Sequence, residues 1–210
     1  AFVAERDARP KELVKYYKLY HYDHHTDTAR AIADRNTVGM KLGMTISEFA
    51  ELRFSESGKR LFFGTAPIVP AKDTTTPEVE QVKVDIWHYN DDYLQTQQLY
   101  ELKRNQERSY VAVYHFDRGR VVQLGSPETE AVYIPKVGDS PWVYATSDYG
   151  KRIPFQWTAA TKKDIYRIDV LTGSRELIKA NLDGNFFASS VSPNGSALVW
   201  YDAGLRQYQS

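Results

Sequence analysis

The chain has 210 residues, with 27 basic and 27 acidic side chains and no cysteine. The balanced charge argues against a nucleic-acid-binding surface and against attachment to an anionic membrane through a polybasic segment. The missing cysteines exclude disulfides, thiolate metal sites and a cysteine nucleophile. No apolar run has the length of a membrane-spanning helix, and the 13% of aromatic residues favours β structure.

The beginning of the chain is not typical of a complete protein. It starts with Ala-Phe-Val-Ala at Ala1, in what reads as the middle of a strand and without a signal peptide. We therefore expect the natural protein to be longer, and any N-terminal targeting signal to be missing from this sequence.

Three segments share a pattern of a β run, a Ser-x-x-Gly turn and a second β run. They lie at 51–66, 144–159 and 188–203. Ser, Asn and Asp initiate such turns through side-chain hydrogen bonds, and Gly adopts the positive φ that the turn requires. Each segment is therefore predicted to form a β-hairpin.

A second repeated unit alternates large apolar residues and ends on Asp or Asn, which predicts a strand that runs into a turn. Its copies lie at 19–23, 86–90, 113–117 and 165–169. After the last copy, Leu171-Thr-Gly173 predicts a turn and 175–178 a further strand. Two successive hairpins make a four-stranded antiparallel sheet, the blade of a β-propeller.

The spacing of the turn glycines indicates where the blades lie. Gly150 and Gly195 are 45 residues apart, which matches one four-stranded blade, whereas Gly58 and Gly150 are 92 apart. The longer interval therefore contains an insertion. We predict a Pro- and Thr-rich loop at 67–82 and a short helix at 93–108 within it.

The predicted fold class is all-β: a β-propeller segment of about three four-stranded antiparallel blades, an incomplete propeller with one short helical insertion. Its parts are the end of a blade at 1–40, an enlarged blade at 44–126, a blade at 131–180 and the start of a blade at 184–210. An open β-sandwich with coincidental turn similarity is the alternative.

The middle of the chain carries a more specific resemblance to a known family. Four stretches and Gln98 resemble the propeller of bacterial prolyl-oligopeptidase-like serine peptidases, and the distinctive element is Asp-x-Trp-His followed by Leu-Gln. The stretches are Leu61–Pro67, Asp85–Gln95, Ser109–His115 and Val122–Leu124. The resemblance extends over nearly the whole chain and is strongest to exported members, so it implies a periplasmic or otherwise exported protein.

The resemblance also implies a division of labour. In such enzymes a propeller sits over an α/β-hydrolase domain of the same polypeptide and filters the access of peptides to a Ser-His-Asp triad, without a cofactor. The nucleophilic serine of such a triad lies in a Gly-x-Ser-x-Gly motif, the nucleophile elbow, which is a tight turn from a strand into a helix. The nearest candidates in this sequence are Gly125-Ser126 and Gly195-Ser196, and both lack the flanking glycines. We therefore predict no catalytic residue in this chain, and a hydrolase domain outside it.

Asp91, Asp92 and Tyr93 are the candidate substrate-binding residues. In dipeptidyl members of the family, acidic residues of the propeller hold the free amino terminus of the substrate by charge-assisted hydrogen bonds. That motif does not match this sequence residue by residue. Carboxylates at a turn or a helix start also accept hydrogen bonds from backbone N–H groups, and this structural role is the expectation.

His21, Asp23, His24 and His25 offer metal-ligating atoms close together in the sequence. On a strand, His21 and Asp23 share one face, whereas His24 and His25 lie in the following turn and point elsewhere. We therefore predict no metal site.

The remaining candidates are expected to have structural roles. His88 and His115 occupy equivalent strand positions of the repeat, which predicts packing between blades. Lys59-Arg60 and Lys151-Arg152 follow turn glycines and are expected on exposed turns. The tryptophans are expected in the core: Trp87, Trp142, Trp157 and Trp200.

Two functional hypotheses follow from the sequence. The first is a non-catalytic propeller segment that gates and lines the substrate chamber of a serine peptidase. The second is a stand-alone binding propeller for a carbohydrate or a protein partner. A propeller polysaccharide lyase is a third, but it would need a metal cluster of His and Gln that the sequence does not supply.

Overall fold

The structure is a computed structural model that describes residues 1–9, 12–71, 74–77, 79–81, 84, 86–158, 161–183 and 190–210. Several predicted features lie partly outside these residues. They are Asp85 of the distinctive motif, Ala159, residues 72, 73, 78 and 82 of the 67–82 loop, and 184–189, where the last blade and the third hairpin begin.

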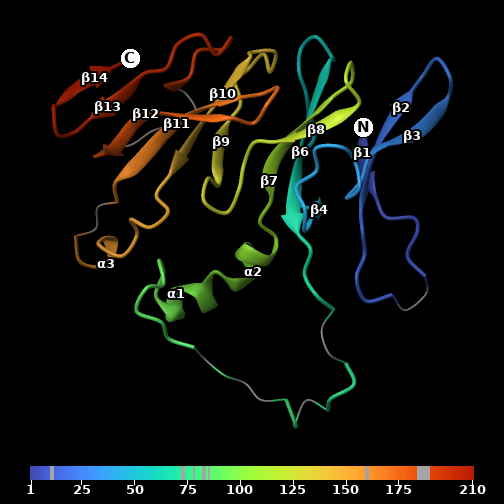
Figure 1. Cartoon of the computed structure of the whole chain (residues 1–210), viewed down its shortest axis with the longest axis horizontal. Helices are drawn as coiled ribbons and strands as arrows, with labels where there is room; N and C mark the ends of the chain where they lie inside the picture. The colour runs from blue at the N-terminus through green and yellow to red at the C-terminus, as the bar shows by residue number, and fades with distance from the viewer. Residues whose placement is uncertain are drawn as a thin grey trace.

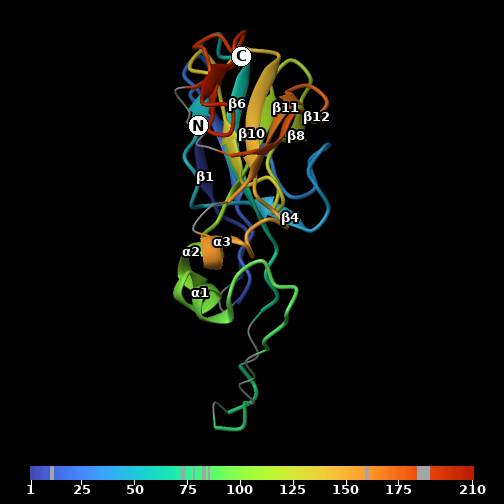
Figure 2. The ribbon, with the colours of Figure 1, turned by 90° about the vertical axis from the view of Figure 1, so that its left-hand side faces the viewer.

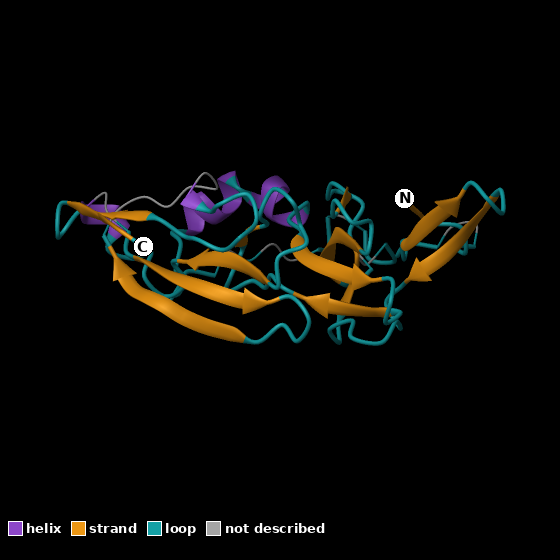
Figure 3. Cartoon of the chain, turned by 90° about the horizontal axis from the view of Figure 1, so that it is seen from above, coloured by secondary structure: helices purple, strands orange, loops and turns teal. Residues whose placement is uncertain are grey.

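The strands form antiparallel sheets that follow one another along the chain (Figure 1). The first sheet contains β1 (Phe2–Ala4), β2 (Lys18–Asp23) and β3 (Thr28–Ala33). The second contains β4 (Met44–Ile46), β5 (Arg53–Phe54), β6 (Arg60–Pro67), β7 (Tyr110–His115) and β8 (Arg120–Gln123). The third contains β9 (Ala131–Tyr133), β10 (Trp142–Ser147), β11 (Lys163–Asp169) and β12 (Arg175–Leu182), and the last β13 (Trp200–Asp202) and β14 (Gln207–Gln209). Seen from above, the sheets stand in an elongated row (Figure 3).

The two central sheets have the topology of propeller blades. The third sheet is a meander in which each strand pairs with the next one in the sequence. In the second sheet, β4 and β5 pair with successive parts of β6, at Thr65–Pro67 and at Leu61–Phe62. They therefore act as one interrupted edge strand, and this sheet is also a four-stranded antiparallel meander.

Alternation along the strands explains how the row of sheets is held together. In β6, Leu61 and Phe63 pack into a core cluster with Leu19 of the first sheet, whereas Phe62 packs into a cluster with Val143 of the third. Successive side chains of a strand point to opposite faces, so adjacent residues reach different neighbouring sheets. A further cluster joins the third sheet to Trp200 of β13. The chain is thus a propeller-like, all-β protein.

Three short helices lie at one end of the central sheets. They are α1 (Gln95–Tyr100), α2 (Leu102–Gln106) and α3 (Phe155–Thr158). The views from two sides agree that they lie together beyond the ends of the strands (Figure 1, Figure 2). None of the helices among the described residues is long and apolar enough to cross a membrane.

Several local predictions are confirmed. Gly58, Gly150 and Gly195 all adopt a positive φ between 71° and 72°. The first hairpin pairs β5 with β6, and the predicted strands at 19–23, 113–117 and 165–169 fall in β2, β7 and β11. The turn at 171–173 and the following strand, β12, are also present, and the helix predicted at 93–108 is the pair α1 and α2.

Two strand predictions are wrong. Residues 86–90 form no strand, because the insertion that contains them leaves from β6 and returns to β7, and both of these strands already have partners on each side. Residues 153–158 turn into α3 instead of completing a hairpin after Gly150. Pro154 favours this turn, since its fixed φ suits a helix start and it has no N–H to donate to a strand partner.

Candidate functional site

The insertion between β6 and β7 folds back against the turn that follows β10, and the contact is centred on Arg152. The Arg152 side chain is only 10% exposed, and its Nη2 lies 2.7 Å from Asp148 Oδ1 and 3.5 Å from Glu130 Oε1. Its Nη1 lies 3.8 Å from Asp92 Oδ2, and its guanidinium stacks 4.6 Å from the centre of the Tyr93 ring. Arg152 therefore joins the insertion to the third sheet.

Asp92 and Tyr93 have structural roles in this contact. Asp92 Oδ2 accepts a hydrogen bond of 2.7 Å from the Gly150 N–H. Burial raises the pKa of the Tyr93 hydroxyl, and the nearby Arg152 partly opposes that rise. The expected helix-start role is wrong in detail, because the N-cap of α1 is Leu94 and it has no side-chain cap. Asp92 instead satisfies an N–H of a distant turn.

Asp91 differs from Asp92 because it faces a pocket and pairs with no cationic side chain among the described residues. Its Oδ2 accepts a hydrogen bond of 3.3 Å from Gln98 Nε2, which also donates to Tyr93 O at 2.9 Å. The Asp91 N–H is bound to His88 O at 3.1 Å. The backbone and Gln98 thus hold Asp91 in place while leaving acceptor positions on its carboxylate.

The pocket beside Asp91 has a volume of about 320 Å³. Its lining residues are Trp87, His88, Tyr89, Asp91, Tyr93, Leu94, Gln95, Ile153, Gln156 and Trp157. Among the described residues of this lining, Asp91 is the one carboxylate, and none of them is Lys or Arg. A carboxylate among aromatic rings suits an ammonium or another cationic group, through a charge-assisted hydrogen bond and cation–π contacts.

A smaller pocket of about 180 Å³ adjoins this one. It shares Tyr93 and Gln156 with the Asp91 pocket, and Asp148 and Arg152 also line it. A more open depression of about 510 Å³ lies beyond it, lined by α2, Phe49 and Glu130. The ion pairs of Glu130 with Arg108 and Arg152 connect the two.

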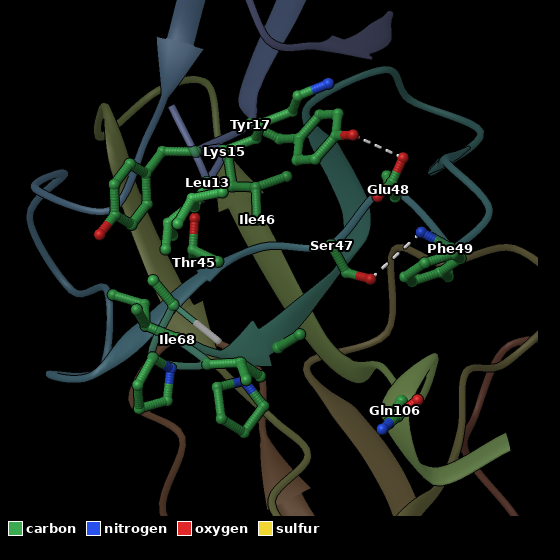
Figure 4. A pocket seen from close by; sticks show the side chains of 17 residues that line it. Leu13, Lys15, Tyr17, Thr45, Ile46, Ser47, Glu48, Phe49, Ile68 and Gln106 are labelled. Carbon is green, nitrogen blue, oxygen red and sulfur yellow. Dashed lines mark hydrogen bonds between the residues drawn. The ribbon is translucent and has the colours of Figure 1, made fainter. Parts of the chain in front are cut away.

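The pocket near β4 continues this series (Figure 4). It has a volume of about 380 Å³ and shares Phe49 with the open depression, while Gln106 of α2 lies at its side. The Tyr17 hydroxyl donates a hydrogen bond of 2.6 Å to Glu48, and this bond raises the pKa of Tyr17 to about 12. Shared residues and ion pairs thus link four hollows along the helical end of the sheets; we call this series the pocket row.

The tryptophan predictions are only partly confirmed. Trp200 is buried and Trp142 is partly buried, but Trp87 is 65% and Trp157 is 76% exposed. These two lie in the insertion and in α3, where no neighbouring sheet covers them. They line the Asp91 pocket and do not pack in the core.

The predictions for the histidines and for the Lys-Arg pairs are also only partly confirmed. His115 is buried and its Nε2 lies 3.0 Å from Val170 O of the next sheet, as a packing role requires, whereas His88 is exposed and outside any strand. Lys59 is exposed, but Arg60 turns inward and donates to Ser140 O at 2.6 Å. The surface role predicted for Arg60 and Arg152 is therefore wrong.

Sequence reasoning identified Asp91, Asp92 and Tyr93 but missed the residues that complete the pocket from the third sheet. These are Ile153, Gln156 and Trp157. The sequence does contain one indication of this contact, the Lys-Arg pair that is repeated after the turn glycines and that includes Arg152. The sequence predicts a surface role because charged residues after a turn glycine are usually exposed, and it does not show that Asp92 and Glu130 lie beside Arg152.

The sequence matches no protein family model and no curated protein. A solved structure to which it is similar is that of TolB from Acinetobacter baumannii, at 13% sequence identity and a TM-score of 0.34. The match covers 95% of this chain and 33% of that one, so this chain spans about a third of its length.

Proposed function

We propose that this chain is the non-catalytic propeller segment of a prolyl-oligopeptidase-like serine peptidase, and that it holds peptide substrates for a separate α/β-hydrolase domain. The family resemblance supports the proposal, because the stretch that carries it forms one wall of the Asp91 pocket. Trp87, His88 and Leu94 line the pocket, and Gln98 fixes Asp91. The resemblance also supports export of the parent protein, the longer polypeptide of which this chain would be a part.

The observation that carries the proposal is the pocket row, with its acidic and aromatic end. An extended peptide needs a succession of side-chain pockets together with polar groups that bind its backbone and termini. The row offers four such hollows across two blades. Asp91 among the rings suits the amino terminus of the peptide, and the hollow beside Tyr17 suits a side chain further along.

The chemistry itself belongs elsewhere in the parent protein. This sequence contains no Gly-x-Ser-x-Gly elbow. An exposed nucleophilic serine of this kind requires that strained strand-to-helix turn. We therefore expect the purified chain to hydrolyse no peptide, and its role to be substrate binding and selection.

The decisive experiment uses the full-length parent with aminoacyl- and prolyl-arylamide substrates. Hydrolysis is expected, and it should disappear when the elbow serine of the hydrolase domain is replaced by Ala. Parent protein that shows no serine-dependent cleavage of any of these substrates would overturn the peptidase proposal.

Asp91→Asn tests the role of the pocket within the same enzyme. Losing one charge-assisted hydrogen bond should raise KM for substrates with a free amino terminus by about 10-fold or more, with a smaller effect on kcat. N-acetylated substrates, which lack the positive charge, should be cleaved equally by both proteins. Asp117→Asn is the matched control, since Asp117 is exposed in the β7–β8 turn. Equal KM values for Asp91→Asn and wild type on free-amine substrates would exclude this role.

The exposed tryptophans favour a second candidate function, a stand-alone propeller that binds a carbohydrate. Trp87 and Trp157 present apolar faces beside the polar groups of Asp91 and Gln156 in one pocket. Titrating the chain with oligosaccharides and with short peptides, and following tryptophan fluorescence, separates the two candidates. Saturable quenching by an oligosaccharide but by no peptide would support the second.

A further inference from the structure

The turn between β2 and β3 brings three metal-ligating side chains together. Asp23 ends β2 and pairs with Thr28 at the start of β3, so residues 24–27 form the tip of the hairpin. One ligand atom from each of Asp23, His24 and His25 lies within 4.8 Å of the others. This is the one group of three such residues that the described part of the chain contains.

Local hydrogen bonds explain why these side chains converge. Asp23 Oδ1 accepts a hydrogen bond of 2.9 Å from the His25 N–H, and Asp23 Oδ2 lies 3.4 Å from Thr26 Oγ1. The carboxylate therefore folds back over the turn. The two imidazole rings lie 3.8 Å apart, centre to centre, so both are on the same side. The expectation that the turn histidines point away from Asp23 is wrong, because the tight turn reverses the chain.

The imidazoles are also available for binding. His24 and His25 are exposed, and no hydrogen bond joins either ring to another described residue. His21 is different: its ring packs against Phe116 at 5.0 Å and Phe54 at 6.0 Å on the strand. The structure therefore separates His21 from His24 and His25, as the sequence predicts, but Asp23 lies with the two turn histidines.

The donor set selects the kind of metal. Two imidazole nitrogens and one carboxylate oxygen match Zn²⁺, whereas Ca²⁺ and Mg²⁺ prefer oxygen ligands alone. Ligand atoms around a tetrahedral Zn²⁺ are about 3.3 Å apart when the bonds are about 2.0 Å long. The ligand atoms of the cluster lie within 4.8 Å of one another, so binding would require the exposed histidine side chains to rotate toward the ion.

We propose that Asp23, His24 and His25 bind one Zn²⁺ ion at the tip of the β2–β3 hairpin, with the fourth coordination position open to water. The ion would link the three residues and fix the turn. In Figure 1 the tip lies at the end of the molecule opposite α1–α3, so this site is separate from the pocket row. The proposal does not depend on the peptidase function.

The test is a calorimetric titration of the untagged chain with ZnCl₂ at neutral pH. Saturable binding of one Zn²⁺ per chain is expected. The double substitution His24→Ala/His25→Ala should weaken binding by about 10-fold or more, and Asp23→Asn should weaken it less. His88→Ala is the matched control, because His88 is also exposed but lies in the insertion. Circular dichroism spectra should be the same for all variants, since the turn is on the surface.

Two further outcomes decide the proposal. Addition of Zn²⁺ should shift the imidazole ¹⁵N resonances of His24 and His25 and leave those of His115 unchanged, because His115 is buried. The proposal is overturned if no saturable binding occurs. It is equally overturned if the double variant binds Zn²⁺ as tightly as wild type, or if His88→Ala alone abolishes binding.

Discussion

Aromatic side chains such as Phe62 are buried where the central sheets pack against each other, whereas several along the α1–α3 end face solvent. Phe62 is 2% exposed between the second and third sheets, while Trp157 in α3 is 76% exposed. The sheets cover each other's faces, so alternation along a strand buries every second residue on each side. No such cover exists for the helices, none of which has a buried residue. The helical end is held by ion pairs and leaves its rings available for binding.

The largest expected effect comes from removing a core ring. Phe62→Ala should lower the free energy of unfolding by about 3–5 kcal/mol, because it removes buried contacts and leaves a cavity between two sheets. Phe155→Ala, at a ring 53% exposed in α3, should change it by no more than about 0.5 kcal/mol. Urea unfolding of both variants measures the difference, and equal losses would contradict the division between the two regions.

Arg152→Ala should destabilise the protein through charge. It leaves Asp148, Glu130 and Asp92 without their shared, largely buried cation, at a cost of about 3 kcal/mol. Arg118→Ala, which removes an exposed arginine 3.8 Å from Asp117, should cost less than about 1 kcal/mol. Chemical denaturation compares the two. Similar small losses for both arginines would show that the ion cluster does not anchor the insertion.

Asp164 allows a test by pH. Burial acts to raise the pKa of its carboxyl, but the hydrogen bonds from Lys151 and from the Asn181 N–H outweigh burial and hold the pKa below the usual 3.8. Because the pKa is lower in the folded state, its contribution to stability is present above the unfolded pKa and is lost as pH falls through the folded pKa.

Asp164→Asn should therefore cost about 2 kcal/mol at pH 7 and progressively less as the pH is lowered below about 4. Unfolding free energies of both proteins, measured from neutral to acidic pH, give the two curves. They should converge at low pH, where the wild-type carboxyl is protonated. Curves that stay parallel would exclude this electrostatic contribution.

The smallest effect is expected at the exposed tryptophans. Replacing Trp87 and Trp157 together by Phe should change stability by no more than about 0.5 kcal/mol, because neither ring packs in the core. Quenching of the remaining fluorescence by iodide should fall sharply, since the other two tryptophans are less exposed. Strong destabilisation would restore the core role that sequence predicted for them.

The sequence by itself determined the elements whose cause is local. Apolar alternation predicts β2, β7 and β11, and the turn glycines predict the positive φ at Gly58, Gly150 and Gly195. These features need only neighbouring residues, because side chains alternate across a strand and glycine has no Cβ to clash. The propeller-like architecture follows from their repetition.

Only the tertiary structure decided which side chains meet across distant segments. The same alternation gave a wrong strand at 86–90, because a strand forms only where a neighbour has unpaired backbone groups. Arg152 reaches Asp92 across 60 positions of sequence, and this contact brings Trp157 beside Asp91. The β2–β3 turn likewise brings the side chains of His24 and His25 beside Asp23, although the sequence predicts that they point away from it. Contacts of this kind depend on how distant segments of the chain are brought together in space. The periodicity of apolar residues along the sequence does not predict this.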